Sequence, residues 1–225
     1  DEPCGSAAGT RLPSLESMVD QLAASGHGLI MCMGKGGVGK TTIASAIAVR
    51  LAEQGHDVHL TTTDPAGHLD HTLGGRTDLP HLTVSGIDPV QALIEYREHV
   101  MATKGRDLDD AGRAVLAEDL LSPCTEEVAV FKQFSRMVNQ ARRSFVVMDT
   151  APTGHTLLLM DAAGSYHREI ARNMTDGVQY TTPMMRLRDP DYTRILLVTL
   201  PEPTPVLEAS ILQDDLNRAG IQPWG

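Results

Sequence analysis

One glycine-rich segment of the sequence combines residue types that bind phosphate. Residues 34–41 read Gly-Lys-Gly-Gly-Val-Gly-Lys-Thr and fit the pattern G-x-x-x-x-G-K-[ST]. Glycines let backbone N–H groups converge on phosphate oxygens, while Lys40 reaches the terminal phosphates of a nucleotide such as ATP and Thr41 reaches Mg²⁺. A glycine-rich turn without a ligand is the weaker alternative. The segment predicts a nucleotide-binding loop made of Gly34, Lys35, Gly36, Gly37, Val38, Gly39, Lys40, Thr41 and Thr42.

Two aspartates follow apolar segments and complete the expected site. Asp149 ends the run Phe-Val-Val-Met-Asp, and Asp64 follows the β-branched run 58–63. Ligands of open parallel sheets bind outside the carboxyl ends of the strands, so both carboxylates are expected beside the loop. We predict that Asp149, Asp64 and Thr41 hold Mg²⁺, directly or through water. Either aspartate could instead cap a loop, but two of them beside a phosphate loop favour the metal.

The elements that must position these residues alternate along the chain. Short apolar or β-branched runs predict four strands, and segments with helical spacing of apolar residues separate them. Strand–helix alternation predicts an α/β fold of the P-loop NTPase type, a mostly parallel sheet with helices on both faces. The expected strands are 29–33, 58–63, 144–148 and 194–200; the expected helices are 15–24, 41–54, 88–102, 108–120, 125–140 and 206–218.

Length and composition limit the organisation of the chain. The 225 residues suit one large domain, which we expect over 15–225 and truncated at its C-terminus, after a Gly-, Ala-, Ser- and Pro-rich tail or linker over 1–14. The net charge of −10 argues against nucleic-acid binding and against docking on anionic lipid. No apolar run reaches the length of a membrane span. Three widely spaced cysteines indicate a reducing cytoplasm rather than a disulfide framework.

A second lysine distinguishes this loop from a general phosphate-binding loop. The segment GKGGVGKTT, residues 34–42, resembles the deviant Walker A family of ATPases. The resemblance implies that Lys35 crosses to the nucleotide of a facing domain, where it stabilises developing charge as an arginine finger does. It also implies that Asp64 orients the attacking water, so Asp64, Lys35 and Lys40 are the candidate catalytic residues. A solvated loop lysine is the alternative for Lys35.

Four further segments narrow the resemblance within that family. DTAPTGHT (149–156), SPCTEE (122–127), TTPMM (181–185) and LVTLPEPTPVLEA (197–209) resemble arsenite pump ATPases. Two other branches of the family fit less well. Nitrogenase iron proteins need cysteines that bind an iron–sulfur cluster, and none occurs near DTAPTGHT. Cell-division and partition ATPases show neither of the first two segments. The resemblance implies the C-terminal half of a two-half enzyme, with the tail as inter-half linker. Its partners would be the homologous N-terminal half or a second copy, and a membrane permease that attaches this cytoplasmic protein peripherally to the membrane.

The segment SPCTEE carries the metalloid hypothesis. Thr125 is expected to cap the following helix, which places Cys124 at the positive end of the helix dipole, where a thiolate is favoured. As(III) and Sb(III) are thiophilic, and the resemblance implies that Ser122, Cys124 and His155 are their ligands. Taken alone, Cys124 could be a small packing residue and His155 a hydrogen-bonded switch residue. One cysteine cannot satisfy trivalent arsenic, so further thiolates must come from another half or copy.

Two other functions stay open at this point. A tail-anchored membrane-protein targeting ATPase shares the switch segment DTAPTGHT, but usually carries a C-x-x-C zinc pair that this sequence does not contain. The second is a regulatory module that binds a nucleotide without hydrolysing it. The presence of all four expected phosphate- and Mg²⁺-binding residues, Lys40, Thr41, Asp64 and Asp149, argues against it. We therefore predict an ATPase unit of an arsenite or antimonite efflux pump, with ATP and Mg²⁺ as cofactors and As(III) or Sb(III) as activating and transported ligand.

Overall fold

The computed structural model describes residues 13–63, 79–150 and 181–225. Within these ranges one sheet runs through the molecule in the strand order β3-β2-β4-β1-β5, and every neighbouring pair is parallel. The predicted α/β class with a parallel sheet is confirmed. The strands are β1 (Gly28–Met33), β2 (Val58–Thr62), β3 (Leu82–Gly86), β4 (Phe145–Asp149) and β5 (Thr193–Leu197).

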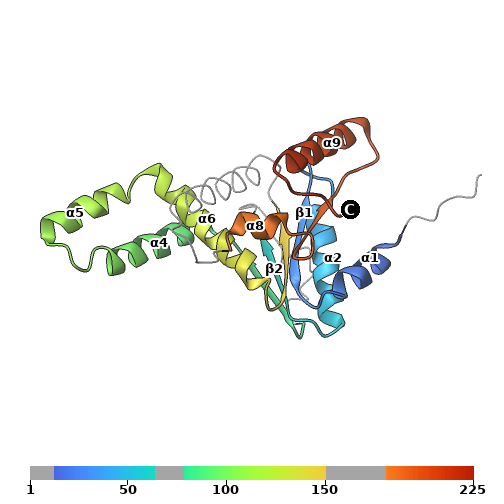
Figure 1. Cartoon of the computed structure of the whole chain (residues 1–225), viewed down its shortest axis with the longest axis horizontal. Helices are drawn as coiled ribbons and strands as arrows, with labels where there is room; N and C mark the ends of the chain where they lie inside the picture. Colours follow the sequence, from blue (N-terminus) through green and yellow to red (C-terminus); the bar gives the residue numbers. More distant parts are fainter. Residues whose placement is uncertain (1–12, 64–78, 151–180) are drawn as a thin grey trace, which may run out of the picture.

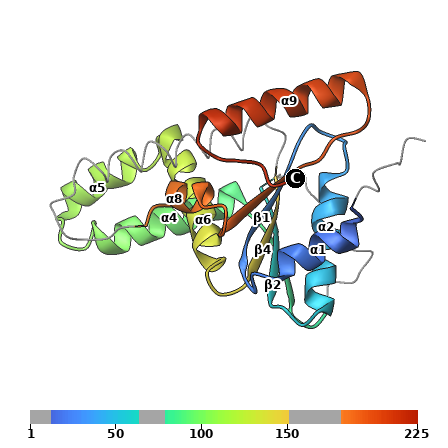
Figure 2. The ribbon, with the colours of Figure 1, turned by 45° about the vertical axis from the view of Figure 1, so that its right-hand side comes forward.

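Helices cover both faces of this sheet (Figure 1). In both views α1 and α2 lie on one side of the strands, while α6 and α8 lie on the other and α9 crosses the upper end (Figure 2). The helices of the described ranges are α1 (Leu15–Ala23), α2 (Lys40–Glu53), α4 (Pro89–Thr103), α5 (Asp110–Asp119), α6 (Pro123–Gln140), α8 (Pro183–Arg188) and α9 (Pro203–Arg218).

The two helical layers follow from the alternation of side chains along β1, an inner strand between β4 and β5. Leu29 and Met31 point to one face and pack into a core shared with α6, α8 and α9. Ile30 and Cys32 point to the other face and pack against α1 and α2. All six residues of β1 are buried, as expected for a strand covered on both faces. The end of β1 is therefore held rigidly where the phosphate-binding loop begins.

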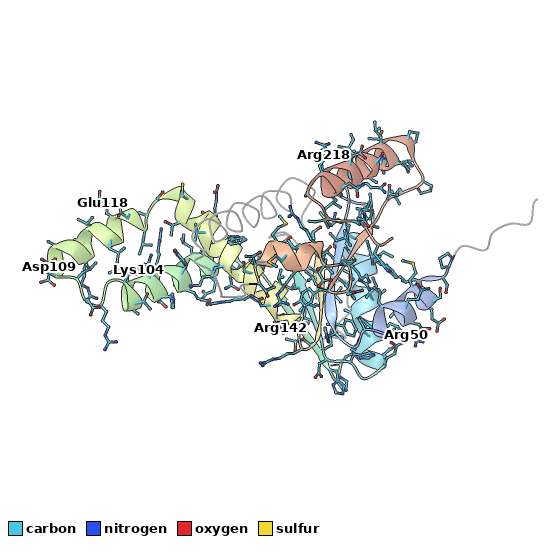
Figure 3. All side chains as sticks on the ribbon, in the orientation of Figure 1. Arg50, Lys104, Asp109, Glu118, Arg142 and Arg218 are labelled. Carbon is cyan, nitrogen blue, oxygen red and sulfur yellow. The ribbon has the colours of Figure 1, made fainter. Side chains whose placement is uncertain are left out.

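The segment α4–α5–α6 projects away from the sheet (Figure 1). Helices α4 and α6 pack against each other, but α5 buries none of its residues. Figure 3 shows the charged residues Asp109 and Glu118 at the end of this projection, far from the strands. The part of α6 nearer the sheet packs into the core that contains Leu29 and Met31, through residues such as Phe134 and Val138.

Several boundaries differ from the sequence-based expectations. Strand β3 was missed because only its first residue is buried, so the hydrophobic signal of an inner strand is absent at this edge. Helix α8 has only 6 residues and is too short to show helical periodicity. Helix α6 begins at Pro123 with Ser122 as N-cap, so the prediction that Thr125 is the cap was wrong. Proline favours the first helical position, and it extends the helix to include Cys124.

The chain after α9 returns to the free edge of β5. Trp224 donates a backbone hydrogen bond of 2.8 Å to Ile195, and Leu197 donates one of 2.7 Å to Gly225. Residues 224–225 thus pair with β5 through their backbone. In the described part of the chain, no helix has the length and apolar character needed to span a membrane.

Candidate nucleotide-binding site

The loop between β1 and α2 presents unused backbone N–H groups. Helix α2 has Gly39 as its N-cap, at φ 97°, and no side chain caps it. Its first intrahelical bond is donated by Ile43 to Gly39 at 3.0 Å. The N–H groups of the preceding helical residues have no acceptor within the helix, and they carry the positive end of its dipole. A glycine cap leaves this end open to an anion such as phosphate.

A glycine is required at position 34 because the backbone of Val198 passes very close to it. A Cβ atom added at Gly34 would lie 2.2 Å from the carbonyl oxygen of Val198, and Gly34 has φ 149°. The neighbouring Met33 carbonyl accepts a hydrogen bond of 2.8 Å from the N–H of Val198. The start of the loop is thus packed, backbone against backbone, onto the segment that leads from β5 to α9.

Lys40 lies inside the loop rather than in solvent. The residue is 7% exposed, and its Nζ donates a hydrogen bond of 2.9 Å to the carbonyl oxygen of Lys35. A buried ammonium needs such an acceptor, since desolvation without one is costly. The loop therefore holds the ammonium close to the open end of α2, where terminal phosphate oxygens of a nucleotide would replace the carbonyl as partners.

The side chains of Thr41, in the first turn of α2, and Asp149, the last residue of β4, are in contact. The hydroxyl of Thr41 donates a hydrogen bond of 2.7 Å to Oδ2 of Asp149, which is 2% exposed at the end of β4. A hydroxyl and a carboxylate at this separation are the hard oxygen ligands that Mg²⁺ prefers. The two residues fit the metal that ATPases use, which would neutralise phosphate charge when bound.

Asp64 and His155 lie outside the described residues, but their neighbours in sequence do not. Thr63 donates its N–H to the carbonyl oxygen of Asp149 at 3.0 Å, so the chain just before Asp64 runs beside Asp149. Thr150 donates its hydroxyl to the carbonyl of Cys32 at 2.8 Å, which ties the end of β4 to β1. The predicted roles of Asp64 and His155 stay predictions.

The thiol of Cys32 lies in a buried, apolar environment next to Asp149. It is fully buried in β1, opposite Asp149 in the strand register. Burial, followed by the negative charge of Asp149, raises the pKa of the Cys32 thiol to about 12, and Lys40 lowers it only in part. The Cys32 thiol is therefore neutral and packed inside the core.

Lys35 has a partner that the sequence did not predict. Its Nζ lies 2.8 Å from Oε1 of Glu208 on α9, and the two side chains are 40% and 41% exposed. The two residues are 173 positions apart. No motif spacing connects positions so distant, so only the packing of α9 could reveal this pair.

The expected metalloid ligands Ser122 and Cys124 lie at the amino end of α6. Both residues are exposed, and Cys124 is a free thiol in the first turn of the helix. The opposite end of α6 lies at the amino edge of the sheet, where Gln140 hydrogen-bonds His59 at 3.0 Å. Figure 1 shows this amino end of α6 on the projecting segment, away from the strands.

Comparison with known proteins decides the family. Residues 27–186 match the family model of the anion-transporting ATPases. The chain belongs to the anion-transporting ATPase family. Membership accounts for the parallel sheet and for the position of the phosphate loop between β1 and α2.

Relatives within the anion-transporting ATPases differ widely in similarity. The chain is 64% identical over 95% of its length to the arsenical pump-driving ATPase of Escherichia coli, and 66% identical over 94% to that of Acidiphilium multivorum. In both cases it spans 36% of the length of the curated relative. Similarity to the ATPase GET3 of Malassezia globosa is lower, at 34% identity over 64% of this chain and 44% of that protein.

Proposed function

We propose that this chain is an ATP-hydrolysing unit of an arsenite or antimonite efflux ATPase. The observation that carries the proposal is the pairing of Thr41 with Asp149 beside an open helix end, in a chain 64% identical to an arsenical pump-driving ATPase. The backbone N–H groups and Lys40 bind the phosphates of ATP. Thr41, Asp149 and Asp64 hold Mg²⁺, and Asp64 orients the water that attacks the γ-phosphate.

Lys35 acts on a second nucleotide site in this proposal. Its side chain is 40% exposed, whereas Lys40 is buried within the loop. An exposed ammonium can reach a phosphate carried by a facing unit, where it stabilises charge that develops during phosphoryl transfer. The facing unit is a homologous half or a second copy, and closure of the two units completes both nucleotide sites.

The metalloid is the transported ligand and bridges the two units. Cys124 supplies one exposed thiol, and Ser122 stands next to the same helix end. Trivalent arsenic and antimony prefer about three soft ligands, so the facing unit supplies the other thiolates. His155 shares the segment 149–156 with Asp149, which would couple metalloid binding to the Mg²⁺–nucleotide site.

Export requires a membrane permease, with the ATPase attached peripherally on the cytoplasmic side. The alternative of a targeting ATPase for tail-anchored proteins has weaker support. High identity over nearly the whole chain is found with relatives named arsenical pump-driving ATPases.

The proposal is tested by the ATPase rate of the intact protein with and without antimonite. We expect antimonite to stimulate turnover of the wild type. Lys40→Ala should lower the rate by at least about 100-fold, because the phosphates lose their ammonium in a desolvated site. Lys104→Ala, at the end of α4, is the matched surface control and should not change the rate. Turnover that is insensitive to antimonite, or near-normal in Lys40→Ala, would contradict the proposal.

A further inference from the structure

Helix α9 places one carboxylate directly on Lys35. Oε1 of Glu208 lies 2.8 Å from Nζ of Lys35, within the range of a charge-assisted hydrogen bond. Leu212 and Leu216, on the next turns of α9, are buried in the core shared with β1 and β5. The packing of α9 therefore fixes the position of Glu208 relative to the loop.

The loop is fixed to the segment that leads into the same helix. Met33 accepts a backbone hydrogen bond of 2.8 Å from Val198, and Gly34 packs against the Val198 carbonyl with no room for a side chain. Lys35 follows these two residues immediately. The backbone contacts at Val198 thus fix the position of Lys35, and the side-chain packing of α9 fixes the position of Glu208. Together they set the distance between the two residues.

The pair is strong enough to orient Lys35 and weak enough to open. Both side chains are about two-fifths exposed, at 40% and 41%. Ion pairs at this exposure are screened by salt and contribute little to folding stability. A phosphate oxygen that carries developing negative charge in a site closed to water would compete successfully for the ammonium.

We propose that Glu208 is a positioning residue that keeps Lys35 on its own domain until a facing nucleotide takes over the ammonium. This inference rests on the proposed function, in which Lys35 acts across an interface. While the ion pair is intact, the Lys35 charge is neutralised and cannot assist hydrolysis elsewhere. Glu208 thereby limits basal turnover without contacting the nucleotide bound by its own loop.

The test is Glu208→Gln in the intact protein, which removes the charge and keeps the size of the side chain. We expect basal kcat, measured without antimonite, to rise about two- to fivefold, the scale of a partly exposed ion pair. KM for ATP should stay within about twofold, because the residues that bind the phosphates are unchanged. Turnover at saturating antimonite should stay near the wild-type value, so that the stimulation ratio falls.

Three controls separate this role from a general structural one. Asp214→Asn removes a carboxylate from an exposed position of the same helix and should leave basal kcat unchanged. Glu208→Asp should restore part of the low basal rate, because the charge is retained. The ratio of Glu208→Gln to wild-type basal rates should approach one at high NaCl, since salt screens the pair.

A double-mutant cycle with Lys35→Ala decides whether Glu208 acts through Lys35. In the Lys35→Ala background, Glu208→Gln should have no further effect. An unchanged or lower basal kcat in Glu208→Gln, or an equal increase in Asp214→Asn, would overturn the inference. These outcomes differ from failure of the proposed function, which would appear as wild-type turnover that does not respond to antimonite.

Discussion

The hydroxyl of Thr41 and the carboxylate of Asp149 lie 2.7 Å apart, which joins the first turn of α2 to the last residue of β4. These residues come from opposite parts of the chain, 108 positions apart. Because Asp149 is buried, its negative charge needs compensation, which the hydroxyl supplies in part and a bound cation would complete.

Thr41→Val should weaken binding of ATP only when Mg²⁺ is present. Valine keeps the shape of the side chain but removes the oxygen ligand and the hydrogen bond to Asp149. We expect affinity for Mg²⁺–ATP to fall at least about tenfold, a change that even outer-shell substitutions reach at metal sites. Affinity measured in EDTA should be unchanged. Titration of a fluorescent ATP analogue measures both, and Thr41→Ser, which keeps the hydroxyl, is the matched control.

Asp64→Asn should separate binding of ATP from its hydrolysis. The amide keeps the shape of the side chain but cannot accept a proton or orient water as a carboxylate does. We expect ATP affinity to be retained while kcat falls by at least about tenfold, and single-turnover kinetics distinguishes the two quantities. A kcat within about threefold of the wild type would show that another group positions the water.

Cys124→Ser should separate metalloid stimulation from basal ATPase activity. Serine is nearly the same size and lies at an exposed position of the first turn of α6, so folding should be unaffected. Its hydroxyl stays protonated near neutral pH and is a poor ligand for As(III) or Sb(III). We expect the half-maximal antimonite concentration to rise at least about tenfold, with basal turnover retained.

The control for this titration is Cys32→Ala, which removes the buried thiol and leaves Cys124 in place. Its half-maximal antimonite concentration should equal that of the wild type. An unchanged value in Cys124→Ser would instead show that Cys124 is not a metalloid ligand. His155→Ala is expected to affect both the metalloid response and Mg²⁺ dependence, since His155 shares a segment with Asp149.

The Cys32 thiol should make the free energy of unfolding sensitive to alkaline pH. Its pKa is about 12 in the fold, against 9.0 for a free thiol, so the unfolded chain loses this proton first as pH rises. Stability from this group is complete below pH 9 and is lost as the pH rises from about 9 to 12. At pH 10 the loss relative to pH 7.5 is about 1.4 kcal/mol.

Urea unfolding of nucleotide-free wild type and Cys32→Ala at both pH values measures this effect. The cost of the substitution should shrink by about 1.4 kcal/mol at pH 10, because the alanine variant has no thiol to ionise. Alkylation at pH 8 provides an independent check, since exposed Cys124 should react and buried Cys32 should not. An equal cost at the two pH values would show that Cys32 ionises as readily in the fold as in the unfolded chain.

The nucleotide loop and the fold class could be predicted from sequence because their signals are local. The pattern 34–41 lies between an apolar run and a helical segment, and each buried strand appears as a short apolar or β-branched run. The strand β3 and the helix α8 gave no such signal, because the first is mostly unburied and the second is too short for periodicity. The cap of α6 was misplaced because Ser122 and Thr125 are both good N-cap residues, and Pro123 decides between them.

The sequence by itself determined which groups are available for chemistry: the glycines and Lys40 of the loop, the hydroxyl of Thr41, and a carboxylate after a buried strand. Tertiary structure alone decided which of them meet. The order β2-β4-β1 places Asp149 next to the loop, and the packing of α9 brings Glu208 to Lys35. Such contacts depend on strand order and helix packing, which act between residues more than 100 positions apart and leave no periodic trace in the sequence.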